Sequence, residues 1–215
     1  MDNVISVKDL SKVYRLYDKP IDRLKESLNI FHKSYHKEYY ALNNLSFDIK
    51  RGETVGIIGI NGAGKSTLLK IIAGIDSNYE GTVLGHNIFY LPEKLTLPKE
   101  LMTYELINQY SKINKSMGSF LELAMNYRLE NMPIKKLSKG MIQKVGIIIS
   151  LLDKYDVILY DEPLEGLDEE AIKSFFGDLK KRSNTVIVMS IHEIPKKLKI
   201  NAKKIFIKDG KLCEE

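Results

Sequence analysis

One segment, GINGAGKST at residues 59–67, restricts the fold of this chain of 215 residues more than any other. It contains three glycines and follows the pattern G-x-x-x-x-G-K-[ST]. The apolar run at residues 55–60 has the length of a buried strand, and residues 65–73 are expected to form a helix that stops at Gly74. A strand, a glycine-rich loop and a helix in this order predict an α/β fold whose loop surrounds a phosphate group.

The glycine-rich loop has the chemistry of a triphosphate site. Its glycines let the backbone approach an anion closely, and the exposed N–H groups and the helix N-terminus attract negative charge. Lys65 is expected to reach the β- and γ-phosphates, Ser66 to ligate Mg²⁺, and Thr67 to contact the α-phosphate. The full set of expected nucleotide contacts from the loop is Asn61, Gly62, Ala63, Gly64, Lys65, Ser66 and Thr67.

Two acidic residues follow a second apolar run, VILY at residues 157–160. Asp161 is suited to the outer shell of Mg²⁺, and Glu162 to holding an attacking water as general base. An acidic pair can also cap a helix, but the buried strand before this pair favours catalysis. His192 ends a further expected strand, which predicts it at the same sheet edge as a contact of the γ-phosphate.

Further segments continue the alternation of strands and helices. Ser138 in KKLSKGMIQKVG is a good N-cap, and Gly140 lies in the first turn after it, so this helix end is a second anion site. Expected strands lie near residues 4–8, 81–84, 88–91 and 185–190, with helices at 138–152 and 169–181, a mostly helical stretch at 93–136, and a C-terminal hairpin turning at Asp209-Gly210. This order predicts a parallel α/β core.

Composition excludes several classes of protein. Cys213 is the single cysteine, so no disulfide can form within the chain. No apolar run approaches the ~18–20 residues that cross a bilayer, and the N-terminal sequence lacks the pattern of a signal peptide. The net charge of +5 is compatible with an anionic membrane surface or nucleic acid, and equally with an ordinary lysine-rich surface.

Residues 15–40 are unusual. Pro20 can begin a helix, and basic residues lie nearby. Apolar residues then recur at helical spacing, at Ile21, Leu24, Leu28 and Phe31. This pattern predicts a short, basic, amphipathic helix. It contacts either a membrane partner or lipid headgroups, or else it covers part of the chain's own sheet.

Together these motifs resemble those of the nucleotide-binding subunits of ABC transporters. GINGAGKST is similar to the Walker A motif, VILYDEP to Walker B, LSKGM to the signature motif, EGLD at 165–168 to the D-loop, and His192 to the switch histidine. The resemblance covers nearly the whole chain. It implies one ABC ATPase domain over residues 1–215: a P-loop NTPase core with a mostly parallel sheet, an antiparallel β subdomain, the insertion at 15–40 and a short helical subdomain at 94–137.

The family pattern also supplies site residues. The position of the usual Q-loop glutamine is Glu93, and a carboxylate is an acceptable ligand of Mg²⁺. The implied metal ligands are therefore Ser66, Glu93 and Asp161. The signature motif departs from the commonest form at Lys139 and Met141.

The aromatic residue that stacks on adenine is expected to be Tyr14. Because the insertion shifts the usual spacing, Tyr17 and Tyr40 are alternatives.

Partners follow from the same resemblance. It implies a head-to-tail dimer, expected to be a homodimer, in which each ATP lies between the Walker A loop of one subunit and Ser138 and Gly140 of the other. The subunit would lie on the cytoplasmic face of the membrane and drive export through a separate transmembrane permease, and no nucleic acid partner is expected. Residues 15–40 resemble exporters of polysaccharides and teichoic acids, whereas the remainder looks more like drug, lantibiotic or lipid exporters.

The sequence is also compatible with two other functions. One is a soluble ABC-type ATPase not coupled to transport, but such proteins usually carry two ATPase units or a long coiled coil. The other is a regulatory subunit that binds ATP without turnover, against which Glu162 and His192 argue.

Overall fold

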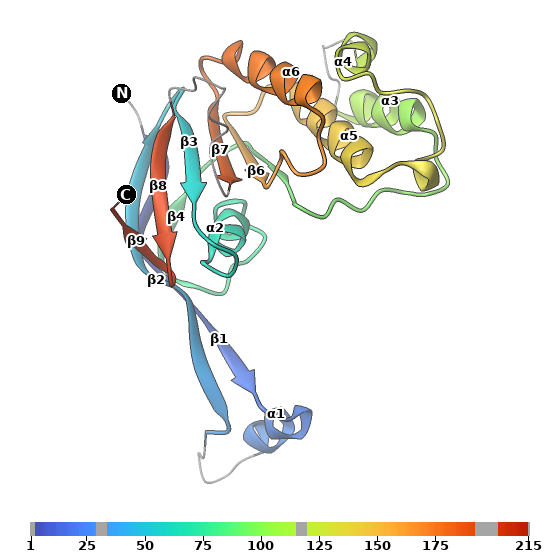
Figure 1. The fold of residues 1–215 in the computed structure, drawn as a ribbon. Helices are drawn as coiled ribbons and strands as arrows, with labels where there is room; N and C mark the ends of the chain where they lie inside the picture. Colours follow the sequence, from blue (N-terminus) through green and yellow to red (C-terminus); the bar gives the residue numbers. More distant parts are fainter. Residues whose placement is uncertain (1–2, 29–33, 115–119, 192–201, 215) are drawn as a thin grey trace.

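The computed structural model describes residues 3–28, 34–114, 120–191 and 202–214. Its main sheet has the strand order β5-β6-β7-β3-β8-β9 (Figure 1). The strands are β3 (Thr54–Ile58), β5 (Ile88–Leu91), β6 (Val157–Asp161), β7 (Val186–Ile191), β8 (Lys203–Lys208) and β9 (Lys211–Cys213). All neighbours pair in parallel except β8 and β9, which form the expected antiparallel hairpin.

A second sheet is antiparallel and has the order β2-β1-β4. Its strands are β1 (Asn3–Tyr17), β2 (His36–Lys50) and β4 (Glu80–Leu84). The parallel core and the antiparallel β subdomain are therefore both present, as the sequence predicts.

Two apolar cores lie on opposite faces of the main sheet. Successive strand residues point to opposite faces, so Val157 and Leu159 of β6 join the core shared with helix α2 (Lys65–Ile72) and the second sheet. Ile158 and Tyr160 join the core shared with α5 (Lys139–Leu152) and α6 (Glu169–Lys180). This double burial explains why β6 is an unbroken apolar run.

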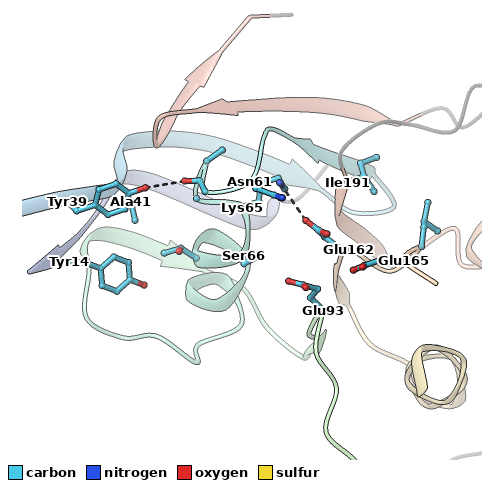
Figure 2. A pocket seen from close by; sticks show the side chains of 15 residues that line it. Tyr14, Tyr39, Ala41, Asn61, Lys65, Ser66, Glu93, Glu162, Glu165 and Ile191 are labelled. Atoms are coloured by element: carbon cyan, nitrogen blue, oxygen red, sulfur yellow. Dashed lines mark hydrogen bonds and ion pairs between the residues drawn. The ribbon is translucent and has the colours of Figure 1, made fainter. Parts of the chain in front are cut away.

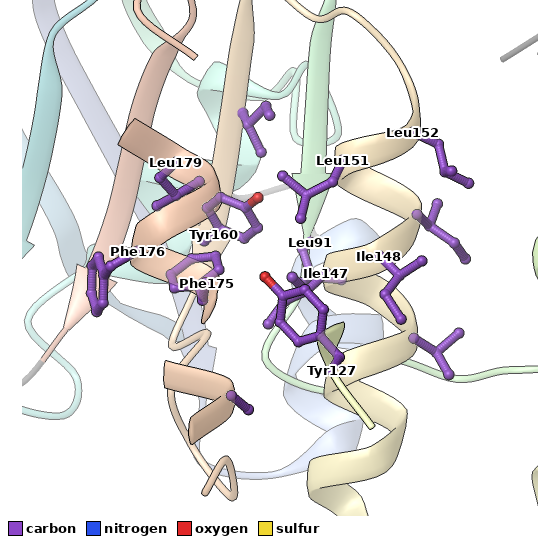
Figure 3. Packing of buried hydrophobic residues seen from close by; sticks show 14 of the residues in the cluster. Leu91, Tyr127, Ile147, Ile148, Leu151, Leu152, Tyr160, Phe175, Phe176 and Leu179 are labelled. Atoms are coloured by element: carbon purple, nitrogen blue, oxygen red, sulfur yellow. The ribbon is translucent and has the colours of Figure 1, made fainter. Parts of the chain in front are cut away.

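Figure 3 shows the second of these cores, in which aromatic and aliphatic side chains of β6, α5 and α6 interlock. The rings of Tyr160 and Phe175 meet edge to face at 5.0 Å between centroids. The buried Tyr160 hydroxyl is 2.7 Å from Ser150 Oγ, and the Tyr127 hydroxyl donates to Asp178 Oδ2 at 3.2 Å. Each buried hydroxyl in this core therefore has a polar partner.

The stretch predicted to be mostly helical is less regular than expected. It contains α3 (Thr103–Ile113), α4 (Phe120–Asn126) and a 3₁₀ turn at Ile134–Lys136. Extended and turn segments lie before α3 and after α4, because Pro98 and Pro133 interrupt the helical pattern there. Both helices pack on α5.

The segment 15–40 contains the predicted short helix between the ends of two strands. Strands β1 and β2 continue beyond the main body as a two-stranded ladder, and α1 (Pro20–Ser27) lies at its tip (Figure 1). No residue of α1 is buried, so this helix does not cover the chain's own sheet. Phe31, which was expected in the same helix, lies outside the described residues. Within the described part of the chain, no helix has the length and apolar character needed to cross a membrane.

Candidate active site

The glycine-rich loop lines a cavity of about 980 Å³ at the carboxyl ends of β3 and β6 (Figure 2). All seven loop residues expected to contact nucleotide line it, and so do Tyr14, Glu93 and Glu162. The other lining residues are Tyr39, Ala41, Leu164, Glu165 and Ile191. Segments far apart in sequence thus meet at one sheet edge, where α/β proteins bind ligands.

The loop is held in shape by close backbone contacts. Gly64, at the N-cap of α2, has a φ of 105°, and a Cβ there would come 2.4 Å from the carbonyl oxygen of Ala41. Only glycine is compatible with both conditions. The buried Lys65 ammonium donates to the carbonyl oxygens of Gly59 at 2.7 Å and Ile60 at 3.2 Å. The loop therefore holds a cation at the cavity, where a phosphate group would need one.

Asp161 is a buried carboxylate with three hydroxyl partners. Its Oδ1 accepts hydrogen bonds from Ser190 Oγ at 2.6 Å and from Ser66 Oγ at 3.0 Å. Its Oδ2 accepts one from the Tyr90 hydroxyl at 3.2 Å. Burial, and next the charge of Asp161, raise the pKa of Tyr90 well above its usual range, so this hydroxyl stays protonated and remains a donor. These bonds fix both oxygens of Asp161.

Glu162 leaves the end of β6 in a left-handed conformation, with a φ of 50°. Such a conformation costs an L-residue roughly 1–2 kcal/mol. Its backbone N–H donates to Ser190 Oγ at 2.9 Å, and its Oε1 lies 3.8 Å from Lys65 Nζ. The turn carries the carboxylate away from the strand toward Lys65 and Glu93, as Figure 2 shows.

The donor atoms at this edge are compatible with a magnesium ion. No three His, Cys, Asp or Glu side chains among the described residues converge into a complete cage. The Ser66 hydroxyl and the Asp161 carboxylate nevertheless lie 3.0 Å apart, and Glu93 lines the same cavity. Mg²⁺ prefers a few oxygen ligands from protein together with substrate phosphates and water, which is the kind of donor set found here.

Ser138 and Gly140 lie apart from this cavity. Ser138 is exposed and caps α5, since its Oγ accepts from the N–H of Met141 at 3.2 Å, as predicted. A Cβ on Gly140 would come 2.0 Å from the carbonyl oxygen of Gly166, so α5 touches the 165–168 loop there. Neither residue lines the cavity, and one chain alone does not bring the two anion sites together.

The structure separates the three aromatic candidates. Tyr14 lines the cavity, whereas Tyr17 donates to Glu26 Oε1 at 3.3 Å near the hairpin tip. Tyr40 pairs with Val13 and does not line the cavity. Tyr39, which the sequence did not indicate, lines it instead.

The predicted γ-phosphate contact, His192, lies outside the described residues. Ile191, directly before it, lines the cavity.

Ser190 and Tyr90 are two further site residues that the motifs did not identify. Each lies near the end of its strand and is followed at short distance by a motif position, Ser190 by His192 and Tyr90 by Glu93. Their short distance in sequence from these two motif positions is the feature by which both residues could be identified as site candidates.

Comparison with known proteins agrees with this geometry. Residues 42–165 match the family model described as ABC transporter. A Thermotoga maritima protein named a probable metal transport system ATP-binding protein is 36% identical over 73% of this chain and 70% of its own length. A Listeria monocytogenes protein named teichoic acids export ATP-binding protein TagH is 34% identical over 86% of this chain, but the match spans only 59% of that relative.

Solved structures give the same result. A dimeric ATP-binding cassette in a post-hydrolysis state, bound to ADP and Pi, superposes with a TM-score of 0.75 at 26% identity and covers 97% of this chain and 96% of that one. The family model, the relatives and this fold lead to one conclusion. The chain belongs to the ABC transporter family, as an ATP-binding subunit with ATPase activity.

Proposed function

We propose that this subunit hydrolyses Mg²⁺-ATP with Glu162 as general base and thereby drives export through a separate membrane permease. The observation that supports the first part most strongly is the convergence of Lys65, Ser66 and Glu162 on one cavity, with Asp161 hydrogen-bonded to Ser66 beside it. These side chains come from two strand ends, and together they supply a cation for phosphate, oxygen ligands for a metal, and a base.

Each residue has a distinct task in the proposed reaction. Lys65 leaves its backbone carbonyl partners to bind the β- and γ-phosphates, and Thr67 contacts the α-phosphate. Glu162 accepts a proton from water as the water oxygen attacks the γ-phosphorus, and the bond to the β–γ bridging oxygen breaks to give ADP and phosphate. When bound, Mg²⁺ would neutralise charge on the phosphates, held by Ser66 and Asp161 with Glu93.

The proposed test is Glu162→Gln, with Glu170→Gln as control because Glu170 is an exposed carboxylate outside the cavity. Glu162→Gln should retain ATP affinity and lower turnover by roughly 10²–10⁴-fold, the usual size of general-base catalysis. ATP affinity is measured by equilibrium titration and turnover by phosphate release. Turnover at the wild-type rate in Glu162→Gln would remove Glu162 from this role.

The active site is proposed to be shared between two identical chains. In support, Ser138 is exposed and the helix N-terminus that it caps lies outside the cavity, so a partner's copy could approach the γ-phosphate bound by the first chain. His192 would complete the contacts. Bound ATP would then hold the two subunits together, and loss of the γ-phosphate would separate them. This cycle of closing and opening would drive a conformational change in the permease.

A mixing experiment tests this shared site. Lys65→Ala and Ser138→Arg should each be inactive as homodimers, while a mixed dimer contains one site with both defects and one with neither. Partial recovery of ATPase activity on mixing supports the model. Full activity from strictly monomeric protein would contradict it.

Export and peripheral attachment to the cytoplasmic membrane face are proposed from the relatives that are named teichoic acid exporters. The apolar side chains of α1 support a contact outside the chain, since Leu24 and Leu28 are 54% and 71% exposed. Leu24→Asp with Leu28→Asp should preserve folding and ATP affinity yet weaken recruitment to membranes that contain the permease. Unchanged recruitment would favour an ATPase not coupled to transport.

A further inference from the structure

The C-terminal hairpin contacts the phosphate loop at two points. Near the start of the loop, Gly59 lies so close to β8 that an added Cβ would come 2.4 Å from the carbonyl oxygen of Ile207. Further along the loop, the carbonyl oxygen of Ala63 accepts a hydrogen bond at 3.3 Å from the N–H of Gly210. Gly210 lies in the turn between β8 and β9, and β9 packs beside β2 (Figure 1).

Gly210 also joins the phosphate loop to β2. It is buried, and its carbonyl oxygen accepts a hydrogen bond from the N–H of Asn43 at 2.8 Å. A Cβ added to Gly210 would come 2.8 Å from the carbonyl oxygen of Ala41, and a Cβ added to Gly64 would come 2.4 Å from the same oxygen. The carbonyl group of Ala41 is therefore enclosed between the phosphate loop and the C-terminal turn.

Gly210 can affect the cavity only through these neighbours. Ala41 and Ala63 both line the cavity, whereas Gly210 does not. The turn that contains Gly210 is tight, since Asp209 and Gly210 have φ values of 49° and 71°, as in the two-residue turns that fit the twist of a β-hairpin. Such a turn fixes the position of the N–H that bonds to Ala63.

A loop that binds phosphate through its backbone depends on support from neighbouring segments. Its N–H groups bind an anion well if they already point to one place, because ordering them on binding would cost conformational entropy. Three of the residues at 59–64 are glycines, which lose more backbone freedom on ordering than any other residue. Contacts such as those of Gly210 reduce this cost before the ligand arrives.

We propose that Gly210 is a positioning residue for phosphate binding, because the C-terminal turn braces the loop through Ala63 and Ala41 and keeps the loop N–H groups directed at the polyphosphate. The inference rests on the proposed binding of a nucleoside triphosphate at this cavity, and it adds a residue far from the loop in sequence. Any side chain at position 210 would push against Ala41 and displace the loop. Phosphate affinity therefore depends on a position outside the cavity.

Three variants test the proposal by equilibrium titration with inorganic tripolyphosphate and with ATP, both with Mg²⁺ present. Gly210→Ala adds a Cβ that meets Ala41, and it also strains the left-handed backbone. Gly210→Asn adds a Cβ at the same place, but asparagine adopts the left-handed conformation more readily than alanine. Gly74→Ala is the matched control, because the φ of Gly74 is 72° and an added Cβ there meets nothing within 4 Å. Thermal unfolding measures the stability of each variant separately.

Both Gly210 variants should bind tripolyphosphate and ATP about 10- to 100-fold more weakly than the wild type, which corresponds to the loss of one hydrogen bond to a charged group. Gly210→Asn should retain more thermal stability than Gly210→Ala yet lose similar affinity, because both variants carry the Cβ that meets Ala41. Gly74→Ala should lower the melting temperature and bind both ligands as the wild type does.

Other results overturn the proposal in recognisable ways. Wild-type affinity in Gly210→Asn would mean that backbone strain, and not the contact with Ala41, weakens binding in Gly210→Ala. An equal loss of affinity in Gly74→Ala would mean that binding only follows stability, and failure of both Gly210 variants to fold would make Gly210 a support of the whole fold and not of the loop. A wild-type chain that binds neither ATP nor tripolyphosphate would refute the proposed function itself, whereas binding that neither Gly210 substitution changes would refute only the positioning role.

Discussion

Ser190→Ala should impair both folding and catalysis, because the Ser190 hydroxyl connects the two acidic residues of the active site. Its Oγ donates to Asp161 Oδ1 at 2.6 Å and accepts from the Glu162 N–H at 2.9 Å, and the side chain is fully buried. Removing it leaves the carboxylate without its shortest hydrogen bond and the amide without that partner. The left-handed turn at Glu162 then loses one of the contacts that hold it.

The size of each effect follows from these contacts. A hydrogen bond to a charged group contributes about 1.5–3 kcal/mol, and an ordinary hydrogen bond such as that of the Glu162 N–H contributes about 0.5–1.5 kcal/mol. Because Ser66 and Tyr90 still donate to Asp161, we expect the free energy of unfolding to fall by about 2–4 kcal/mol in total. A shift of Glu162 by about 1 Å would lower kcat by roughly 10²-fold.

Ser150→Ala is the matched control. Ser150 is also fully buried, and its hydroxyl contacts Ile147 and Tyr160 at 2.7 Å each, but it lies outside the cavity. Denaturant unfolding should show a loss of about 1–3 kcal/mol for this variant as well, while phosphate release at saturating ATP should stay at the wild-type rate. Ser190→Thr keeps the hydroxyl but adds a methyl group to a full core, so it should recover turnover better than stability.

A similar loss of stability in Ser190→Ala and Ser150→Ala, with the wild-type kcat retained in both, would contradict this prediction. Ser190 would then contribute to packing alone, and the orientation of Glu162 would depend on something other than this hydroxyl.

Three further predictions concern single positions. Gly177→Ala, at an exposed helical site where an added Cβ meets nothing within 4 Å, should raise the free energy of unfolding by about 0.5–1 kcal/mol without changing turnover; a fall in melting temperature would contradict this. Gly140→Ala should destabilise the fold by about 1–3 kcal/mol, because its Cβ would clash with Gly166; unchanged chemical denaturation would show that α5 can shift. Hydrogen bonding from Lys144 lowers the pKa of Asp168 below its unfolded value of about 3.9. Its stabilisation is therefore complete above that pH and lost as pH falls through the lower folded-state pKa, and Asp168→Asn should flatten this part of the acid unfolding curve.

The main sheet could be predicted because its signals are local. Apolar runs of strand length mark β3, β6 and β7, whichever strands they pair with. The partners of the strands are not local. Lys50 and Thr54 flank the turn at Arg51-Gly52, yet they belong to different sheets. Gly52 has a φ of 77°, and a Cβ there would come 2.3 Å from the Ser183 carbonyl oxygen, a constraint set by a segment far away in sequence.

In the site, too, residues with local sequence signals could be predicted, and residues placed by distant pairing could not. Residues of contiguous motifs, such as Lys65 and Glu162, were found from the sequence because chemistry and spacing coincide there. Tyr39 was missed because its place depends on the register between β1 and β2, and that register shifts at several irregularities before it reaches Tyr14. A shift of one residue in the register between β1 and β2 would have placed Tyr40, and not Tyr39, on the face of the ladder that lines the cavity.

Helix α1 lies where its apolar stripe predicted a helix, but the stripe alone does not show what holds the helix in place. Eight residues are too few for a stable isolated helix in water, which needs about 12–15. The stripe contributes no burial within the described chain, so it does not hold the helix in place.

Polar contacts hold it instead. Glu26 accepts hydrogen bonds from the Tyr35 N–H at 2.8 Å and from His36 Nδ1 at 2.7 Å, and these bonds keep the pKa of Glu26 below its usual value. The charged residue Glu26 therefore anchors α1 to the hairpin. Leu24 and Leu28, which were expected to contact a membrane partner, lipid headgroups or the chain's own sheet, are exposed. Because the hairpin does not bury these two side chains, we expect them to contact another molecule, as proposed above.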